Sequence, residues 1–209
     1  FIHAASHDFK APITALLGFS ALLYEEIKQT SSKEISHYTR RMVDNSKLLE
    51  KMINELLYIS RLKIKKVEAL DTVVIIKEAM VPLQWSISQK KLDVKINKMP
   101  PIIADREHLL RLFNQLLSNA VKFSPSGKKI FAGFDKQEFY LRDEAGGIKP
   151  ENLDRVFNIF FTTESKNTMS TGAGLYIAKK IVELYNGTIR IESKWGKGTT
   201  VYFKLPPGK

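Results

Sequence analysis

A histidine followed directly by an acidic residue stands near the start of the chain, in the stretch SHDFKAP at residues 6–12. A carboxylate beside an imidazole accepts a hydrogen bond from one ring nitrogen and leaves the other free to act as a nucleophile. Pro12 removes the helical partner of the Asp8 carbonyl. We therefore expect the helix to bend just past His7 and expose its ring. A lone His-Asp pair is, however, more often an ordinary surface histidine.

A second group of polar residues lies in NQLLSNAVKF, residues 114–123. Gln115, Asn119 and Lys122 are spaced by four and three residues, so they share one face of a helix. Amide oxygens can bind Mg2+ and an ammonium group can bind phosphate. Taken alone, such a stripe is more often a solvated helix face.

Glycines mark three further stretches. In RDEAGGI, residues 142–148, Asp143 ends a strand and could accept a hydrogen bond from an exocyclic amine such as that of adenine. In TGAGLYIAKK, residues 171–180, glycines open a helix whose unpaired N–H groups suit phosphate. The third stretch, GKGTTVYF at residues 196–203, is equally compatible with a plain hairpin turn.

Two helices must carry the first of these groups. Apolar residues recur every three or four positions over residues 1–29, with Ser20 as a polar exception. A capping-box signature from Ser31 to Glu34 predicts the start of a second helix. That helix has a heptad seam made of Ile35, Tyr38, Met42, Asn45, Leu49, Met52, Leu56 and Ile59. An antiparallel hairpin cannot cover this seam, so we expect a second copy to complete a four-helix bundle. Asn45 either fixes the register of that bundle or is a tolerated polar residue.

The pattern changes near residue 67, which divides the chain into residues 1–66 and 67–209. Strands and helices then alternate without regular βαβ units, which favours an α+β two-layer sandwich with helices on one face of a mixed sheet. The predicted helices are residues 105–123 and 173–187, and the predicted strands include 128–134, 138–143, 188–193 and 199–206. The basic run RLKIKK at residues 61–66 is interpreted as the exposed end of a helix.

Composition limits the classes of function. The 209 residues include no Cys, which excludes disulfides and thiolate metal sites. No apolar run approaches the roughly 20 residues of a membrane helix. The net charge is +11, but its basic residues are scattered apart from residues 61–66. We therefore expect a phosphate ligand or an acidic partner and no nucleic acid. Because the sequence begins inside a helical pattern, we interpret it as a fragment.

The ordered set of motifs resembles the sensor histidine kinases of two-component systems. SHDFKAP resembles their histidine box, NQLLSNAVKF their asparagine box and DEAGG their first glycine box. FNIFFTTE at residues 157–164 resembles the phenylalanine box, and GAGLYI and GKGT resemble the later glycine boxes. The resemblance covers nearly the whole chain, and Asp105 stands where the family often has an acid before the asparagine-box helix.

The resemblance implies a dimerisation and phosphotransfer hairpin, which becomes a four-helix bundle as a dimer. An ATP-binding sandwich of the histidine kinase, gyrase and Hsp90 type follows it. It also implies autophosphorylation from ATP and transfer to an Asp of a response regulator. By this match His7 is the phosphoacceptor and Asp8 its hydrogen-bonding base. The implied nucleotide residues are Gln115, Asn119, Lys122, Phe123, Asp143, Gly147, Gly172, Gly174, Leu175 and Thr199. Gln115 and Asn119 would also bind Mg2+.

The resemblance further implies a mobile ATP lid at residues 164–171 and a flexible linker after residue 60. The implied partners are a response regulator receiver domain and a second copy of the chain, bound through residues 1–66. A cytoplasmic location is expected, with any membrane attachment through segments outside this sequence.

Three residues depart from the family pattern. Gln115 replaces the usual Mg2+-binding Asn, so metal binding is expected to survive, weakened by the extra methylene. Ala145 replaces the first glycine after Asp143, with little expected harm. Ala11 replaces the Thr or Asn that orients a water in members that dephosphorylate their partner, which predicts weak phosphatase activity.

Three other classes of function share some of these sequence features. A dimeric ATP-binding scaffold without kinase activity is supported by Gln115 and opposed by His7, Asp8, Asn119 and Asp143. A chaperone or topoisomerase of the same ATPase superfamily would lack the histidine-bearing hairpin. A nucleic-acid binder would show a clustered basic face and a reading motif, and the sequence has neither.

Overall fold

The computed structural model describes residues 2–27, 33–162 and 170–205, with the backbone alone at residues 2–12, 15, 26, 33–35 and 38. The chain divides into two compact units. The first comprises Phe1–Leu62 with Thr162–Ala173, and the second comprises Lys63–Phe161 with Gly174–Lys209. We describe each unit by itself.

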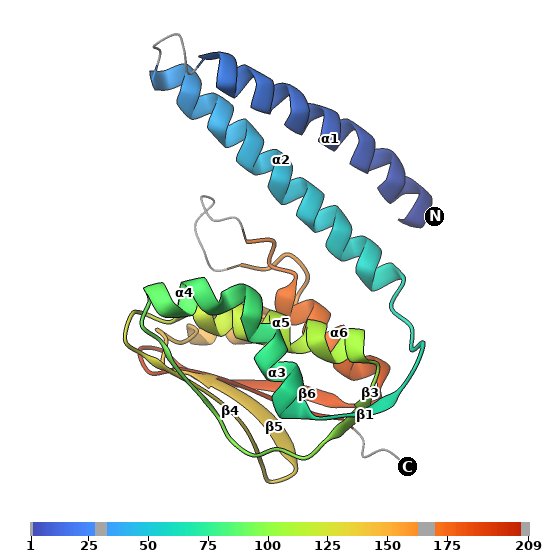
Figure 1. Cartoon of the computed structure of the whole chain (residues 1–209), viewed down its shortest axis with the longest axis vertical. Coiled ribbons are helices and arrows are strands. Elements are labelled where there is room, and N and C mark those ends of the chain that lie inside the picture. The colour runs from blue at the N-terminus through green and yellow to red at the C-terminus, as the bar shows by residue number, and fades with distance from the viewer. Residues whose placement is uncertain (1, 28–32, 163–169, 206–209) are drawn as a thin grey trace. The chain divides into compact units, whose positions relative to one another are not determined.

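The first unit is a helical hairpin. Helix α1 (Ile2–Ile27) and helix α2 (Lys33–Ser60) lie side by side in opposite directions (Figure 1). Pro12 does not interrupt α1, which remains helical over its whole length. Small polar side chains are buried in the hairpin, namely Ser20, Thr39 and Ser46. The Ser46 hydroxyl donates to the carbonyl of Met42 at 2.9 Å, which satisfies it inside the helix.

Much of the apolar surface of the hairpin stays exposed in a single chain. Phe19 is 71% exposed and Leu22 is 68% exposed, and Leu16, Leu23, Met42 and Leu49 are also exposed. Met42 and Leu49 belong to the predicted heptad seam, so at these two positions the seam does not form the contact between α1 and α2. Asn45 is exposed as well, and its side-chain amide donates to the Arg41 carbonyl at 2.9 Å.

The basic run at residues 61–66 corrects one expectation. Helix α2 ends at Ser60, so the run follows the helix instead of forming its last turn. Residues 62–67 are irregular and lead into β1 (Glu68–Leu70). Since Lys65 and Lys66 donate backbone N–H groups to the Asp105 carboxylate, a tertiary contact decides the conformation of this segment.

The second unit contains a five-stranded mixed sheet in the order β2-β4-β5-β7-β6. Strand β2 pairs with β4 in parallel, and all other neighbours are antiparallel. The strands are β2 (Asp93–Ile96), β4 (Lys129–Asp135), β5 (Glu138–Asp143), β6 (Thr188–Lys194) and β7 (Gly198–Lys204). Strand β3 (Ile102–Ala104) pairs separately with β1. The predicted mixed sheet is confirmed.

Helices cover one face of this sheet (Figure 1). They are α3 (Thr72–Met80), η1 (Val81–Leu83), α4 (Gln84–Gln89), α5 (Arg106–Phe123), η2 (Pro150–Arg155) and α6 (Gly174–Leu184). The core lies between the layers, where the Phe203 ring stacks on Phe139 at 5.3 Å and meets the Phe113 edge at 5.8 Å. The sequence predicted α5 and α6, but it did not predict α3 or α4.

Helix α3 shows why patterning missed it. Its run TVVIIKEAM is rich in β-branched residues, which are common in strands. The carboxylate of Asp71 accepts hydrogen bonds from the N–H groups of Val73 and Val74 at 2.8 Å and 3.2 Å. This N-cap, with burial of Ile75 and Ile76 against the core, outweighs the local preference for strand.

Candidate functional site

Helix α5 carries the predicted amide and lysine stripe. Leu112, Leu116 and Ala120 face the core and are buried, whereas Gln115 and Asn119 are half-buried at its edge. Lys122 and Phe123 are exposed in the last turn, with the Lys122 ammonium 4.9 Å from the Phe123 ring centroid. The helix therefore presents two amides and a cation along one side.

The start of α6 lies against these amides. Gly174 is the first residue of α6, and a Cβ added to it would stand 2.8 Å from Oε1 of Gln115 and 3.6 Å from Nδ2 of Asn119. Glycine therefore lets the backbone approach both side chains. Gly172 adopts a left-handed φ of 70°, and Leu175 is half-buried in the first turn of α6. The helix start and the amide pair form one cluster.

Asp143 forms a second cluster at the end of β5. Strand register places it opposite Thr199 of β7. Its Oδ1 accepts hydrogen bonds from the N–H groups of Ala145 at 2.9 Å and Thr199 at 3.1 Å. Among the described residues both of these bonds fall on Oδ1, so Oδ2 is available to a further donor.

The electrostatics of Asp143 suit a ligand-binding carboxylate. Burial raises the pKa of Asp143 above its ordinary value of 3.8, and the hydrogen bonds from the Ala145 and Thr199 N–H groups only partly oppose that effect. A buried carboxylate with a raised pKa is frequent at functional sites, because folding alone does not favour it. A neutral group that donates a hydrogen bond to Oδ2 of Asp143 would offset the free-energy cost of burying the ionised carboxylate.

Gly147 and Ser193 hold the loop that follows Asp143. Gly147 has a φ of 72°, and a Cβ there would lie 2.3 Å from the Lys194 carbonyl oxygen, so no other residue fits without backbone movement. The Ser193 hydroxyl accepts from the Ile148 N–H at 2.8 Å and donates to the Gly198 carbonyl at 3.0 Å. It also lies 2.9 Å from the Thr199 hydroxyl.

Sequence reasoning missed Ser193. The turn at residues 194–198 sets the register of the final hairpin, which places Ser193 directly opposite Thr199. The hairpin register could have identified Ser193 from the sequence. A hydroxyl that lies opposite a predicted site residue across a hairpin is close enough to form a hydrogen bond with it.

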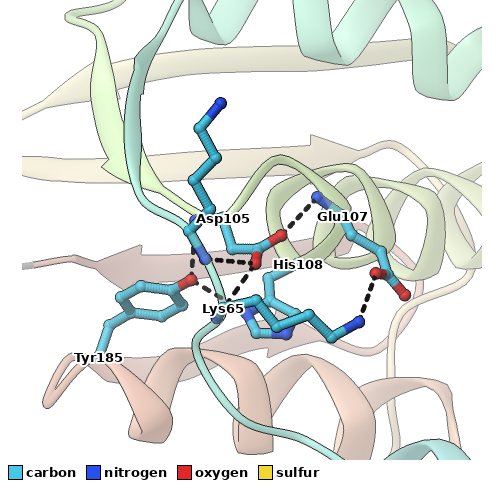
Figure 2. Close-up of polar contacts among 6 residues, drawn as sticks. Lys65, Asp105, Glu107, His108 and Tyr185 are labelled. Carbon is cyan, nitrogen blue, oxygen red and sulfur yellow. Dashed lines mark hydrogen bonds and ion pairs between the residues drawn. The ribbon is translucent and has the colours of Figure 1, made fainter.

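A polar cluster fixes the beginning of α5 (Figure 2). Oδ1 of Asp105 accepts from the Glu107 N–H at 3.0 Å, which caps the helix. Oδ2 accepts from the N–H groups of Lys65 at 3.4 Å and Lys66 at 3.3 Å. Lys65 also forms an exposed ion pair with Glu107 at 3.3 Å. The segment between α2 and β1 is therefore attached to the first turn of the asparagine-box helix.

The same cluster continues into the protein interior. The Asp105 N–H donates to the hydroxyl oxygen of Tyr185 at 2.8 Å, and that hydroxyl lies 2.9 Å from Nδ1 of His108. Which of the two atoms donates in the contact between the Tyr185 hydroxyl and Nδ1 depends on the tautomer of His108. Burial lowers the pKa of His108, although the charges of Asp105 and Glu107 oppose this effect.

This arrangement predicts acid sensitivity of the second unit. As the pH falls below about 6.5, unfolded chains take up a proton on His108 before folded ones do, so the free energy of unfolding decreases. Between pH 7.5 and 5.5 we expect a His108→Gln variant to lose less Tm than the wild type, by about 3 °C. Thermal unfolding followed by circular dichroism measures both slopes.

The titration of Asp105 does not contribute to the difference between pH 7.5 and 5.5. Burial acts to raise the pKa of Asp105, but the N–H groups of Lys66, Glu107 and Lys65 and the charge of His108 outweigh it, and the pKa lies below 3.8. The stability that Asp105 contributes is present above 3.8 and is lost only as the pH falls through its lowered pKa. Equal slopes for wild type and His108→Gln above pH 5.5 would contradict the assigned role of His108.

A family model described as histidine kinase-, DNA gyrase B- and HSP90-like ATPase matches residues 104–209. The chain belongs to this family. A second model, the His Kinase A (phospho-acceptor) domain, matches residues 1–63. The two matches together identify the catalytic core of a sensor histidine kinase, as the motifs predicted, and nothing favours the scaffold alternative.

Curated relatives agree with this identification of a kinase core. Sensor protein SrrB of Staphylococcus aureus is 30% identical over 99% of this chain and 37% of its own length. Phytochrome-like protein Cph1 of Synechocystis is 28% identical over 100% of this chain and 29% of its own length. The chain thus spans well under half of the length of these relatives.

Solved structures show the same fold as this kinase core. ShkA, solved at full length in complex with AMPPNP, matches with a TM-score of 0.73 and 21% identity over 98% of this chain and 45% of that one. The histidine kinase AdeS of Acinetobacter baumannii matches with a TM-score of 0.64 and 21% identity, over 97% of this chain and 98% of that one. The predicted fold class, a helical hairpin followed by an ATPase sandwich, is confirmed.

The structure brings together some predicted site residues of the kinase core. Gln115, Asn119 and Gly174 meet in one cluster, and Asp143 and Thr199 bond directly in the other. His7 and Asp8 lie in α1, but their side chains are outside the described part. Residues 164–169 of the predicted lid and Ser31 of the predicted capping box are also outside it.

Two features concern metals and membranes. Within residues 2–27, 33–162 and 170–205, no three His, Asp or Glu side chains gather closely enough to hold a metal ion. None of the described helices is long and apolar enough to cross a membrane.

Proposed function

We propose that this chain transfers the γ-phosphoryl group of ATP to His7 and then to an Asp of a response regulator. The observation that carries the proposal is the Asp143 carboxylate, which is held by two backbone N–H groups and has Oδ2 available, in a fold of the ATPase family. Such an acceptor suits the exocyclic amine of adenine. The complex of the similar protein ShkA with AMPPNP supports a nucleotide ligand.

Adenine would lie beside Asp143, Gly147 and Thr199. The Ser193 hydrogen bonds keep the Gly147 loop against the final hairpin, so the site is largely formed before ATP arrives. A preformed site loses less conformational entropy on binding.

The phosphates would lie beside the second cluster. Lys122 supplies positive charge, and the backbone at Gly172, Gly174 and Leu175 supplies N–H groups at the start of α6. Asn119 would contact phosphate as well as metal, and Phe123 would border this end of the site.

Mg2+ fits the residues present. The amide groups of Gln115 and Asn119 both lie against Gly174, and side-chain amides and substrate phosphates are common ligands of this ion. The Gln115 side chain is one methylene longer than that of an Asn, so its amide lies further from the helix backbone. We therefore expect weakened affinity for Mg2+. When bound, Mg2+ neutralises charge that develops on the transferred phosphoryl group.

His7 would be the nucleophile, with Asp8 accepting a hydrogen bond from its ring. The match of residues 1–63 to a phospho-acceptor domain supports this assignment. Because the proposed nucleotide site belongs to residues 67–209 and His7 to residues 1–66, we expect the connecting segment to flex during phosphoryl transfer.

The exposed apolar side chains of α1 and α2 support a homodimer through residues 1–66. Leu16, Phe19, Leu22, Leu23, Met42 and Leu49 would be covered by a second copy in a four-helix bundle. We propose a receiver domain as the other partner and no nucleic acid. Any membrane attachment of a cytoplasmic kinase core would use segments outside this chain.

Incubation with γ-labelled ATP and Mg2+ tests the proposed function. The expected result is label on the protein that is lost in acid and stable in base, as for a phosphohistidine. Chase with a receiver domain should then transfer the label. ATP binding without any label would instead favour the scaffold, and absence of ATP binding would contradict the nucleotide site.

Ala11 leads to a prediction about the reverse reaction. Because Ala11 has no group that can orient a water four residues after His7, we expect the chain to dephosphorylate its regulator only weakly. An Ala11→Thr variant should raise that activity about tenfold. A regulator-dephosphorylation assay measures both, and robust wild-type activity would contradict the prediction.

A further inference from the structure

The C-terminal end of α5 needs hydrogen-bond donors. The last carbonyl groups of a helix have no partner within it and carry partial negative charge. The N–H of Ser124 reaches back only to the Ala120 carbonyl, and Ser124 then leaves the helix with an extended backbone. The carbonyls of the final turn, which holds Lys122 and Phe123, therefore depend on donors from elsewhere.

Lys90 supplies these donors from a different element. Its ammonium group donates to the carbonyl oxygens of Val121 at 2.8 Å, Lys122 at 2.7 Å and Ser124 at 3.1 Å. An ammonium has three N–H donors, so all of them are used on this one helix end. Its charge also complements the negative end of the helix.

The backbone around Lys90 is fixed in turn. Lys90 caps α4, and Lys91 then takes a left-handed φ of 50° that turns the chain into β2. The Gly127 N–H donates to the Lys90 carbonyl at 2.8 Å, and the Asp93 N–H donates to the Lys128 carbonyl at 3.1 Å. The turn after α4 is therefore joined to the connection between α5 and β4.

Both ends of α5 are consequently attached to other parts of the second unit. Asp105 caps its start and binds the segment before β1, whereas Lys90 binds its end. Asn119 and Lys122 lie in the last two turns of α5, nearer to the helix end that Lys90 binds than to the helix start that Asp105 caps. Fraying of that end would displace Lys122 and Phe123 first.

We propose that Lys90 is a positioning residue for the nucleotide site: its ammonium holds the last turn of α5 so that Lys122 and Asn119 meet the phosphates of ATP. The inference rests on the proposed nucleotide site. Lys90 acts through the helix and does not itself touch the nucleotide. A displacement of about 1 Å in such a group costs up to about 100-fold in activity.

A Lys90→Met variant tests the inference, with Lys128→Met as its matched control. Met keeps the length of the side chain and removes its charge and donors. Lys128 is exposed and lies in the same connection, so the control removes the same charge at the surface. Calorimetry at 15 °C, on protein shown to be folded by circular dichroism, measures affinity for ATP and for adenosine separately.

We expect Lys90→Met to bind ATP about tenfold more weakly and adenosine within twofold of wild type. Lys90→Arg should recover part of the ATP affinity, because a guanidinium also donates to carbonyls. Lys128→Met should match the wild type. An unchanged ATP affinity in folded Lys90→Met, or an equal loss for ATP and adenosine, would overturn the inference.

An Asn119→Ala variant separates this inference from the proposed site. If the wild type binds ATP and Asn119→Ala weakens that binding, the site stands, and the Lys90 variants alone decide the inference. If the wild type fails to bind ATP, the proposed site fails and the inference fails with it.

Discussion

A His7→Gln variant of this chain is expected to take up no label from γ-labelled ATP. Gln cannot form a stable phosphoryl bond, and the proposed acceptor is a single ring nitrogen, so the loss should be complete, at least about 1,000-fold. The measurement is acid-labile, base-stable label on wild type and variant under identical conditions.

His37 provides the matched control for this prediction. It lies on the exposed side of α2, so a His37→Gln variant makes the same chemical change away from the proposed acceptor. ATP affinity of His7→Gln should equal that of the wild type, because none of the proposed nucleotide residues lies in α1 or α2. Label retained on His7→Gln, or lost from His37→Gln, would show that the acceptor is not His7.

An Asp143→Asn variant should separate stability from nucleotide affinity. Burial raises the pKa of Asp143, so keeping it ionised at neutral pH costs free energy in the absence of a ligand. Asn retains an oxygen for the N–H groups of Ala145 and Thr199. We therefore expect the Tm without nucleotide to stay constant or rise.

The affinity of Asp143→Asn for ATP should fall about 100-fold, because its amide N–H2 would face the amine of adenine and two donors cannot bond. Thermal unfolding and calorimetry with ATP give the two quantities. Asp154→Asn, on the exposed η2 turn, is the matched control and should change neither.

The sign of the pH dependence follows from the same group. Wild-type ATP affinity should fall on acidification at a pH above the ordinary carboxyl pKa of 3.8, because the folded carboxyl takes up its proton earlier. Asp143→Asn should lack this fall. A parallel fall in both proteins would assign the pH dependence to another group.

The sequence by itself determined the order of the motifs and most of the elements that carry them. Period and capping are local properties, so the helix ending at Phe123 and the hairpin around Lys136 and Gln137 followed from nearby residues. The family could be identified for the same reason, since its motifs are short and stand in a fixed order.

Only the tertiary structure decided the contacts between distant segments. Lys65 and Lys66 read as a basic helix end, but their N–H groups bind Asp105, 40 and 39 residues away. In the sequence, Lys90 is one of many scattered basic residues. In the structure, it binds the end of α5 more than 30 residues later. Neither contact has a local sequence signal, because a side chain's partner across the fold depends on how the layers pack.

The heptad seam of α2 separates the two kinds of information most clearly. The sequence determined which residues are apolar, and the hairpin of a single chain decided that Met42 and Leu49 stay exposed while Thr39 and Ser46 are buried. Small side chains let α1 and α2 approach each other, which leaves the larger apolar ones for another surface. The periodicity of apolar residues predicts that a helix face will be buried. The packing of the tertiary structure decides which other surface covers it.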